Sequence, residues 1–256
     1  MKAGQSKSAI LWSWDQFGCD KEQCLDPDAV TCAHCDLGVR AFCAGLSNDQ
    51  FRRFVAVLGQ ASVEAQGTVF REGDQAQNIY TITAGAVKLY KLLSDGRRQI
   101  IGFYFPGDFF GFSDSGHYAY TAEAMLPLMV CRFPRAKLDA LFAEIPVLEK
   151  KVLRVATQEL AAAHDQILLL GRKTARERLA SFVLSIWKRL GCADDPSAPV
   201  TLPMGRADIA DFLGLTIETV SRTFTALRQE GLIGLPDTSH LVIRQAEVLR
   251  RIAEGY

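Results

Sequence analysis

"GRADIADFLGLTIETVSRTFTALRQEGLI" (Gly205–Ile233) is the stretch that decides the fold of the C-terminal part of this 256-residue chain. Residues 206–213 have the apolar spacing of a short helix, Gly214 permits a tight turn, and Thr216 can begin a second helix. Two short helices joined by a glycine-containing turn are typical of a helix-turn-helix. The stretch therefore predicts this motif.

The second helix of the stretch has an apolar face and a polar face. The apolar side chains, which we expect to pack inward, are Ile217, Val220, Phe224 and Leu227. The polar side chains on the opposite face are Glu218, Ser221, Arg222 and Thr225. Arginine can donate two hydrogen bonds to guanine, glutamate can accept one from cytosine, and serine can do either. We interpret this face as DNA-reading, against the alternative that any amphipathic helix has a polar outer side.

The residues after the second helix predict a wing. "LIGLPDTSHLVI" (232–243) contains two apolar runs separated by a turn at 236–239. Upstream, "RKTARERLASFVLSIWKRLG" (172–191) has the pattern of a further helix. Lys+Arg and Asp+Glu are equal at 29 each, so attraction to DNA must come from where the charges lie.

The middle of the chain predicts a short helix followed by many strands. Ser47 can cap a helix that Gly59 can end. Residues 66–135 are rich in β-branched and aromatic residues, with glycines at short intervals, and "SDGR" (94–97) contains an Asp-Gly hairpin turn. Many short strands with regular glycines favour a sandwich or barrel.

Residues 146–171 predict one long helix, because no breaker interrupts the run from Pro146 to Gly171. This helix carries two adjacent apolar stripes. The first stripe contains Leu148, Val152, Val155, Ala162 and Leu169. The second contains Leu153, Ala156, Leu160, Ala163, Ile167 and Leu170. One stripe can pack on the chain's own barrel, and the other needs a second partner, most simply the same helix of another subunit.

Burial of the whole helix inside one domain is the alternative to this dimer. We expect a dimer interface that includes Val152, Arg154, Val155, Ala162, Asp165 and Leu169. Asp165 is in addition a candidate for charge repulsion between subunits, or else an ordinary solvated carboxylate.

Five of the seven cysteines fall between positions 19 and 43, and "TCAHCDLGVRAFC" (31–43) holds three of them. The spacing of Cys32 and Cys35 lets both sulfurs reach one metal centre, and Cys43 follows. Clustered thiols in a cytoplasmic protein more often bind metal or react than form disulfides. From the residues alone, a disulfide, a zinc site, an iron–sulfur cluster and unliganded thiols all stay open.

The totals bound the class of protein. Apolar residues make up 48% and charged residues 23% of the chain, which is a globular composition. No run is long enough to cross a bilayer, and residues 1–18 lack the apolar core of a signal peptide. We therefore expect a cytoplasmic protein with no membrane partner. No catalytic constellation of side chains is present in the sequence, so we do not expect an enzyme.

Three segments resemble the CRP/FNR family of bacterial transcription regulators, and its FNR branch in particular. They are "GDFFGF" (107–112), "DQILLLGRKTARERLASFVL" (165–184) and "GRADIADFLGLTIETVSR" (205–222). The resemblance covers nearly the whole chain and implies an α+β fold. Its parts would be a cysteine-rich segment (1–46), a cupin-like β-roll sensor domain (47–145), a dimerisation helix (146–171) and a winged helix-turn-helix (172–256). It implies a homodimer on palindromic double-stranded DNA, with RNA polymerase as a further partner.

The resemblance also implies base contacts. The Glu-x-x-Ser-Arg pattern at Glu218, Ser221 and Arg222 is similar to the FNR pattern that reads TTGAT-N4-ATCAA. By this resemblance Arg222 contacts guanine, Glu218 contacts the cytosine side, and Ser221 helps distinguish FNR from CRP half-sites. We add Thr216 and Thr225 as DNA-binding residues.

Cyclic nucleotides are a ligand class that the sequence disfavours. CRP-like binders carry a Gly-Glu segment followed shortly by Arg-Ser or Arg-Thr. Here the region "GDFFGFSDSGHYAYTAEA" (107–124) contains no arginine. A buried phosphate without a cation is costly, so we expect no cyclic nucleotide.

FNR-type regulators hold a [4Fe–4S] cluster with three N-terminal cysteines and one from the barrel. The resemblance therefore implies Cys32, Cys35, Cys43 and Cys131 as ligands of one oxygen-sensing cluster per subunit, active in DNA binding under low oxygen. The separation of Cys35 from Cys43 is similar to that of FnrN-like proteins.

Other uses of the cysteines and the barrel stay open beside the cluster. Zinc could bind the same cysteines, or cysteines together with His34, and the thiols could form a redox site. A haem- or ligand-sensing barrel is a further alternative, although we expect His117 to be an ordinary loop residue. Cys19 and Cys24 are spare or could replace one of the N-terminal ligands, and we expect Cys192 to be incidental.

Overall fold

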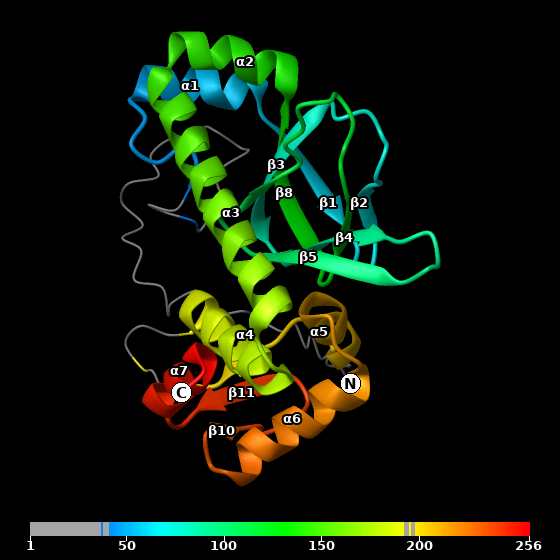
Figure 1. Cartoon of the computed structure of the whole chain (residues 1–256). Helices are drawn as coiled ribbons and strands as arrows, with labels where there is room; N and C mark the ends of the chain where they lie inside the picture. The colour runs from blue at the N-terminus through cyan, green and yellow to red at the C-terminus, as the bar shows by residue number, and fades with distance from the viewer. Residues whose placement is uncertain (1–36, 38–40, 192–194, 196–197) are drawn as a thin grey trace, which may run out of the picture.

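The computed structural model describes residue 37, residues 41–191, residue 195 and residues 198–256. A two-sheet domain lies beside one end of a long helix, and a smaller helical domain lies around its other end (Figure 1). This arrangement confirms the α+β fold expected from the sequence. Of the predicted cysteine-rich segment, only residues 37 and 41–46 are among those described.

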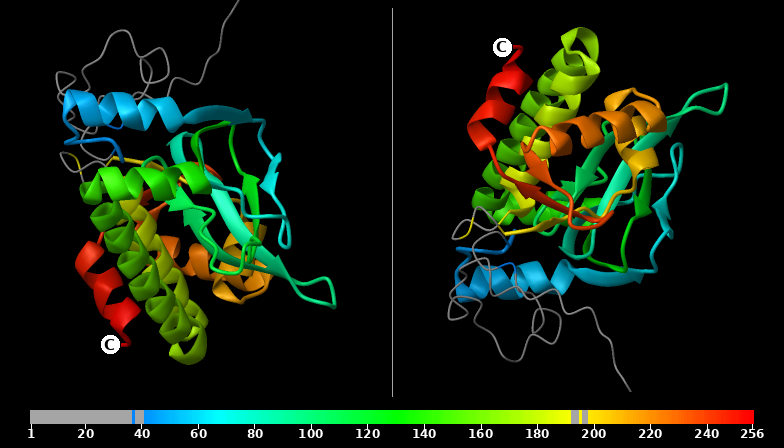
Figure 2. Two further views of the ribbon diagram at one scale, coloured as in Figure 1. Left: turned by 90° about the horizontal axis from the view of Figure 1, so that it is seen from above. Right: turned by 90° about the horizontal axis from the view of Figure 1, so that it is seen from below.

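The first helix, α1 (Asn48–Val57), begins as predicted. Ser47 and Gln50 form a capping box, in which the Gln50 amide donates to Ser47 Oγ (3.4 Å) and the Ser47 amide donates to Gln50 Oε1 (3.0 Å). Gly59 does not end the helix as expected, because the backbone is already extended at Leu58 and Gly59 begins the first strand. Helix α2 (Arg135–Glu144) lies next to α1 at the same end of the molecule (Figures 1 and 2).

Eight strands form two four-stranded antiparallel sheets in the sensor domain. The strands are β1 (Gly59–Val63), β2 (Thr68–Phe70), β3 (Asn78–Ala84), β4 (Val87–Leu92), β5 (Arg98–Tyr104), β6 (Phe109–Phe110), β7 (Thr121–Ala124) and β8 (Leu128–Pro134). The orders are β1-β8-β3-β6 and β2-β7-β4-β5. The predicted hairpin turn joins β4 to β5, with Gly96 at a φ of 85°.

Aromatic rings fill the space between the two sheets. Phe70 stacks on Tyr118 with ring centroids 3.6 Å apart, and Tyr80 stacks on Phe110 at 5.2 Å. All four side chains are buried. The interior of the sandwich is therefore a packed aromatic core.

Helix α3 (Pro146–Arg172) leads from the sensor domain to the C-terminal domain. Pro146 occupies its first turn, where a missing N–H costs nothing. With 27 residues at 1.5 Å each, the helix is about 40 Å long. The single long helix predicted from residue 146 is confirmed.

The C-terminal domain contains helices α4 (Ala175–Leu190), α5 (Arg206–Leu213), α6 (Ile217–Gln229) and α7 (Ala246–Glu254). The predicted wing is present as β10 (Ile233–Gly234) and β11 (His240–Ile243), and β9 (Val200–Thr201) completes a sheet of order β10-β11-β9. Neither β9 nor α7 was predicted. With two residues, β9 is too short to show the alternation of a strand in the sequence. Helix α7 packs on α4, and its Leu249 is completely buried.

Among the described residues, no helix combines the length and the apolar character needed to cross a membrane.

Candidate DNA-reading surface, dimer face and cysteine site

The helix-turn-helix forms where the sequence predicts it. Gly214 sits at the left-handed C-cap of α5 with φ of 61°, and Thr216 caps α6 by accepting a hydrogen bond from the Thr219 amide at 3.2 Å. Val220, Phe224 and Leu227 are at most 1% exposed. These buried side chains fix which face of α6 points outward.

One residue of the predicted apolar face of α6 is exposed and not buried. Ile217 is 48% exposed, not packed inward. Ile217 is the first residue of α6. The later turns of the helix pack on the core, and Ile217 lies beyond the edge of that core. The expectation of an inward Ile217 was wrong.

The outward face of α6 presents the predicted polar residues together. Glu218, Ser221, Arg222 and Thr225 are all exposed. The pKa of Glu218 is lowered because its own backbone amide and the Thr216 hydroxyl donate to the carboxylate, with a further contribution from Arg222. Glu218 is therefore ionised at neutral pH and can act as an acceptor. Thr216 also has the capping role described above.

Arg178 of α4 joins the end of α3 to the helix-turn-helix. Its guanidinium donates to the carbonyls of Leu170 (2.9 Å), Lys173 (2.9 Å) and Leu213 (2.8 Å). These carbonyls lie at the C-terminal ends of α3 and α5, where helix carbonyls lack partners within the helix. A single cation thus fixes the DNA-reading unit to the end of the long helix.

Ion pairs also hold the helix-turn-helix against the sensor domain. Lys88 of β4 lies 3.0 Å from both Glu123 and Asp208, and Arg98 of β5 lies 2.7 Å from Asp208 and 2.8 Å from Asp211. The Lys88 side chain is only 10% exposed. Because buried charges are tolerated only when they are paired, this network fixes the position of α5. Figure 1 shows α5 next to β5.

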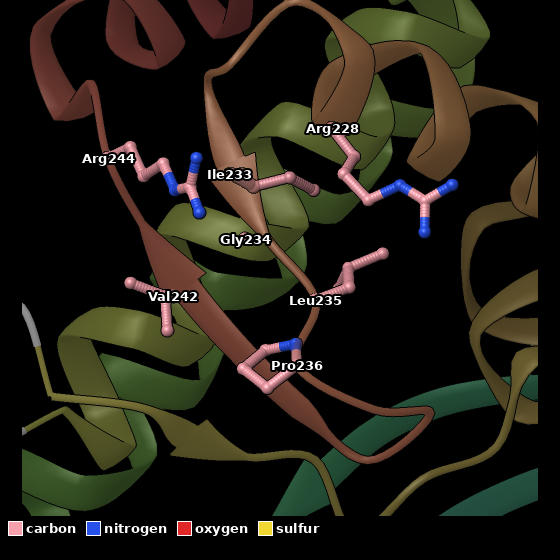
Figure 3. A pocket seen from close by; sticks show the side chains of 7 residues that line it. All are labelled: Arg228, Ile233, Gly234, Leu235, Pro236, Val242 and Arg244. Carbon is pink, nitrogen blue, oxygen red and sulfur yellow. The ribbon is translucent and has the colours of Figure 1, made fainter.

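A basic hollow lies between the end of α6 and the wing (Figure 3). Its lining residues are Arg228, Ile233, Gly234, Leu235, Pro236, Val242 and Arg244. Arg228 and Arg244 were not predicted from the sequence as site residues. Helical spacing could have found the first, because Arg228 follows Ser221 by seven residues and shares its face.

The long helix packs on its own chain along part of the first apolar stripe. Leu148 is fully buried, Val152 and Val155 pack on the same cluster, and Leu169 is 9% exposed in a second cluster. The second stripe is open along most of its length, since Leu153, Leu160 and Ile167 are 68%, 57% and 66% exposed, whereas Leu170 at its end packs on the C-terminal core.

The packing within one subunit leaves the predicted dimer interface a prediction. Val152, Val155 and Leu169 contact their own subunit, whereas Arg154, Ala162 and Asp165 are exposed on α3. The three open apolar side chains are spaced by seven residues, as in a helix-to-helix seam. We propose that Leu153, Leu160 and Ile167 add the apolar part of the interface.

Two of the four predicted cluster ligands lie in the described part of the chain. Cys43 is in a turn at residues 41–45, and Cys131 is in β8, where it is 8% exposed. Both pack on one apolar cluster with Phe133 and with Leu148 of α3. Cys32 and Cys35, together with Cys19, Cys24, His34 and Cys192, lie outside the described residues. Within the described residues, no group of three or more metal-ligating side chains is gathered.

His117 lies on the surface of the sensor domain. It is exposed, it bridges to Gln75, and its carbonyl accepts a hydrogen bond from Ser113 at 2.6 Å. This placement fits a loop residue.

Known proteins resemble the chain over most of its length. The family model "Cyclic nucleotide-binding domain" matches residues 60–145, and "Bacterial regulatory proteins, crp family" matches residues 202–233. The nitrogen fixation regulation protein FixK of Bradyrhizobium diazoefficiens is 41% identical over 211 residues, which cover 82% of this chain and 89% of that protein. The chain belongs to the CRP/FNR family of transcription regulators.

Further comparisons agree with membership in the CRP/FNR family. The transcriptional activator protein FnrL of Cereibacter sphaeroides is 34% identical and covers 83% of this chain and 87% of its own. The structure of FixK2 from Bradyrhizobium japonicum matches with a TM-score of 0.72 and 38% identity, covering 77% of this chain and 97% of that one. A CooA mutant from Carboxydothermus hydrogenoformans, with a TM-score of 0.68 and 18% identity, shares the fold. Members of the CRP/FNR family bind DNA as dimers, which agrees with the exposed faces of α6 and α3.

Proposed function

We propose that this CRP/FNR regulator is an FNR-type oxygen-responsive activator that works in the cytoplasm. Under low oxygen it binds TTGAT-N4-ATCAA-like palindromes as a homodimer. The observation that carries the proposal is the packing of Cys43 and Cys131 on one apolar cluster that includes Leu148 of α3. Both sulfurs are thus separated from the dimerisation helix by one layer of side chains, so a change at either sulfur can alter the packing of that helix.

The proposed cofactor is one [4Fe–4S] cluster per subunit, held by Cys32, Cys35, Cys43 and Cys131. Cysteine sulfur is the donor type that such clusters take. When bound, the cluster supplies reactivity toward oxygen. The chain itself provides an apolar wall of rings, since Phe42 lies 4.6 Å from Phe109 and 6.0 Å from Phe133 between centroids. This wall limits the access of water to the Cys131 side of the site.

The proposed DNA contacts use the outward face of α6. Arg222 would donate to guanine, Glu218 would accept from cytosine N4, and Ser221 would add half-site discrimination. Support comes from the exposure of all three side chains and from the lowered pKa of Glu218, which keeps an ionised acceptor at the helix start. Thr225 extends the same face, and its hydroxyl donates to the Ser221 carbonyl at 3.0 Å.

We also propose that the sensor domain takes no cyclic nucleotide. Its interior is occupied by the packed rings of Phe70, Tyr80, Phe110 and Tyr118, and residues 107–124 offer no arginine for a phosphate. We attribute the match to the cyclic nucleotide-binding family model to the shared sheet architecture. RNA polymerase is the proposed protein partner, in line with the activator names of relatives.

The test is the metal content of protein purified without oxygen. About four irons and four sulfides per subunit, with a visible band that bleaches in air, support the proposal. Cys43→Ala and Cys131→Ala should lose the band, whereas Cys192→Ala is the matched control that keeps it. Colourless protein containing zinc, or metal-free protein whose thiols oxidise reversibly, would overturn the cluster in favour of a zinc or thiol-redox site.

A further inference from the structure

Lys151 of α3 reaches the turn that carries Cys43. Its ammonium donates to the carbonyl of Phe42 at 2.9 Å and to the carbonyl of Ala44. These two carbonyls flank Cys43 on either side in the chain. One side chain of the dimerisation helix therefore holds both peptide groups next to a proposed ligand.

The contact is unusual for a lysine. Lys151 is half-buried, whereas lysine ordinarily keeps its head in water. The pKa of Lys151 is lowered by desolvation, and Cys43 acts in the opposite direction. Ordering a long side chain and desolvating its charge both cost free energy. The two carbonyls are the groups that offset this cost.

The turn at residues 41–45 is shaped by hydrogen bonds of its own and attached by an apolar and a polar contact. Within it, the Ala44 amide donates to the Ala41 carbonyl at 3.0 Å, and the Leu46 amide donates to the Cys43 carbonyl at 3.2 Å. On one side the buried ring of Phe42 anchors the turn to the sandwich through Phe109. Lys151 adds a polar anchor to α3.

The position of Lys151 on α3 gives this anchor a consequence. Val152, the next residue, packs on the cluster that holds Cys43 and Cys131. Leu153, two residues on, begins the open apolar stripe at 68% exposed. One side of this helical turn therefore packs against the cysteine site, and its other side belongs to the proposed dimer face.

We propose that Lys151 is a positioning residue that clamps the Cys43 turn to α3 and so couples the cysteine site to the dimerisation helix. The clamp itself concerns the chain alone, while its role at a cluster rests on the proposed function. The clamp would hold Cys43 in position as a ligand, and it would pass a displacement of the Cys43 turn to α3 through the same hydrogen bonds.

The first arm of the test measures the clamp without any metal. Lys151→Met keeps the apolar stem and removes the donors, Lys151→Arg restores a cation, and Lys150→Met is the matched control at the exposed neighbouring lysine. In metal-free protein, hydrogen exchange of the Ala44 and Leu46 amides should speed up roughly tenfold or more in Lys151→Met. It should stay unchanged in Lys150→Met and return toward wild type in Lys151→Arg. Circular dichroism and thermal melting verify that each variant is folded.

The second arm measures the cluster. In anaerobically purified protein, Lys151→Met should bleach in air several-fold faster than wild type, with Lys150→Met unchanged. Exchange at Ala44 and Leu46 that is the same in wild type and folded Lys151→Met would overturn the clamp. Faster exchange with an unchanged bleaching rate would overturn its role at the cluster. Wild-type protein without iron would overturn the proposed function and with it that role, while the exchange arm still decides the clamp.

Discussion

Leu160 in the middle of the open stripe of α3 allows the dimer to be tested quantitatively. Leu160→Ala removes three carbon atoms, which contribute about 0.8 kcal/mol each when fully buried. Because 57% of the residue is exposed in the single chain, pairing can bury roughly that share, or about 1.4 kcal/mol per subunit. A two-fold dimer loses this twice, so the loss is about 3 kcal/mol, which corresponds to a roughly 100-fold higher Kd for dimerisation.

Analytical ultracentrifugation of anaerobic protein over a range of concentrations measures this Kd. Leu92→Ala is the matched control, because Leu92 is similarly exposed at 61% but lies in β4 of the sensor domain. The control should dimerise as wild type does. An unchanged Kd for Leu160→Ala, or an equal rise for both variants, would refute the assignment of the interface to this stripe.

Three further predictions concern the other contacts. Arg222→Ala should weaken binding to the palindrome by about 1–3 kcal/mol per half-site and relax the preference for guanine. Competition binding with base-substituted duplexes measures both effects. An equal loss of affinity on all sequences would contradict base reading by Arg222. Asp208→Asn should destabilise the protein by about 2 kcal/mol, a figure discounted for partial exposure, because Lys88 loses an ionised partner. A urea unfolding midpoint identical to that of wild type would contradict the role of this ion pair in holding α5 against the sensor domain. The pKa of Glu230 is lowered by its hydrogen bond to Arg176, so the stabilisation is present above the ordinary glutamate pKa and lost as pH falls through the lowered value. Glu230→Gln should therefore flatten the fall of the melting temperature as the pH drops below the ordinary glutamate pKa, and an unchanged profile would argue against this pair.

The local features of the fold could be predicted from the sequence. Capping by Ser47, the hairpin at Gly96 and the turn at Gly214 each depend on residues within a few positions of one another. The outward residues of α6 follow from helical periodicity alone. Ile217 is an exception, since periodicity does not say where the core ends along a helix.

Contacts between distant segments could not be predicted in the same way. Which stripe of α3 packs on its own chain depends on where the sandwich and α2 lie, and both stripes are apolar. The pairing of Lys88 with Asp208 joins residues 120 positions apart. The approach of Cys43 to the cluster that contains Cys131 requires the register of β8 in its sheet. The ligand set itself was implied by resemblance, and all four ligands stay a prediction.

The central claim is that oxygen controls DNA binding through the cysteine site. The most direct measurement is fluorescence anisotropy with a labelled TTGAT-N4-ATCAA duplex, titrated with anaerobic protein and then with the same protein after exposure to air. We predict a loss of affinity in air of roughly 5- to 150-fold, the usual range of coupling between two sites. Cys131→Ala should bind weakly in both conditions. Equal, tight binding by wild type with and without oxygen would contradict the account.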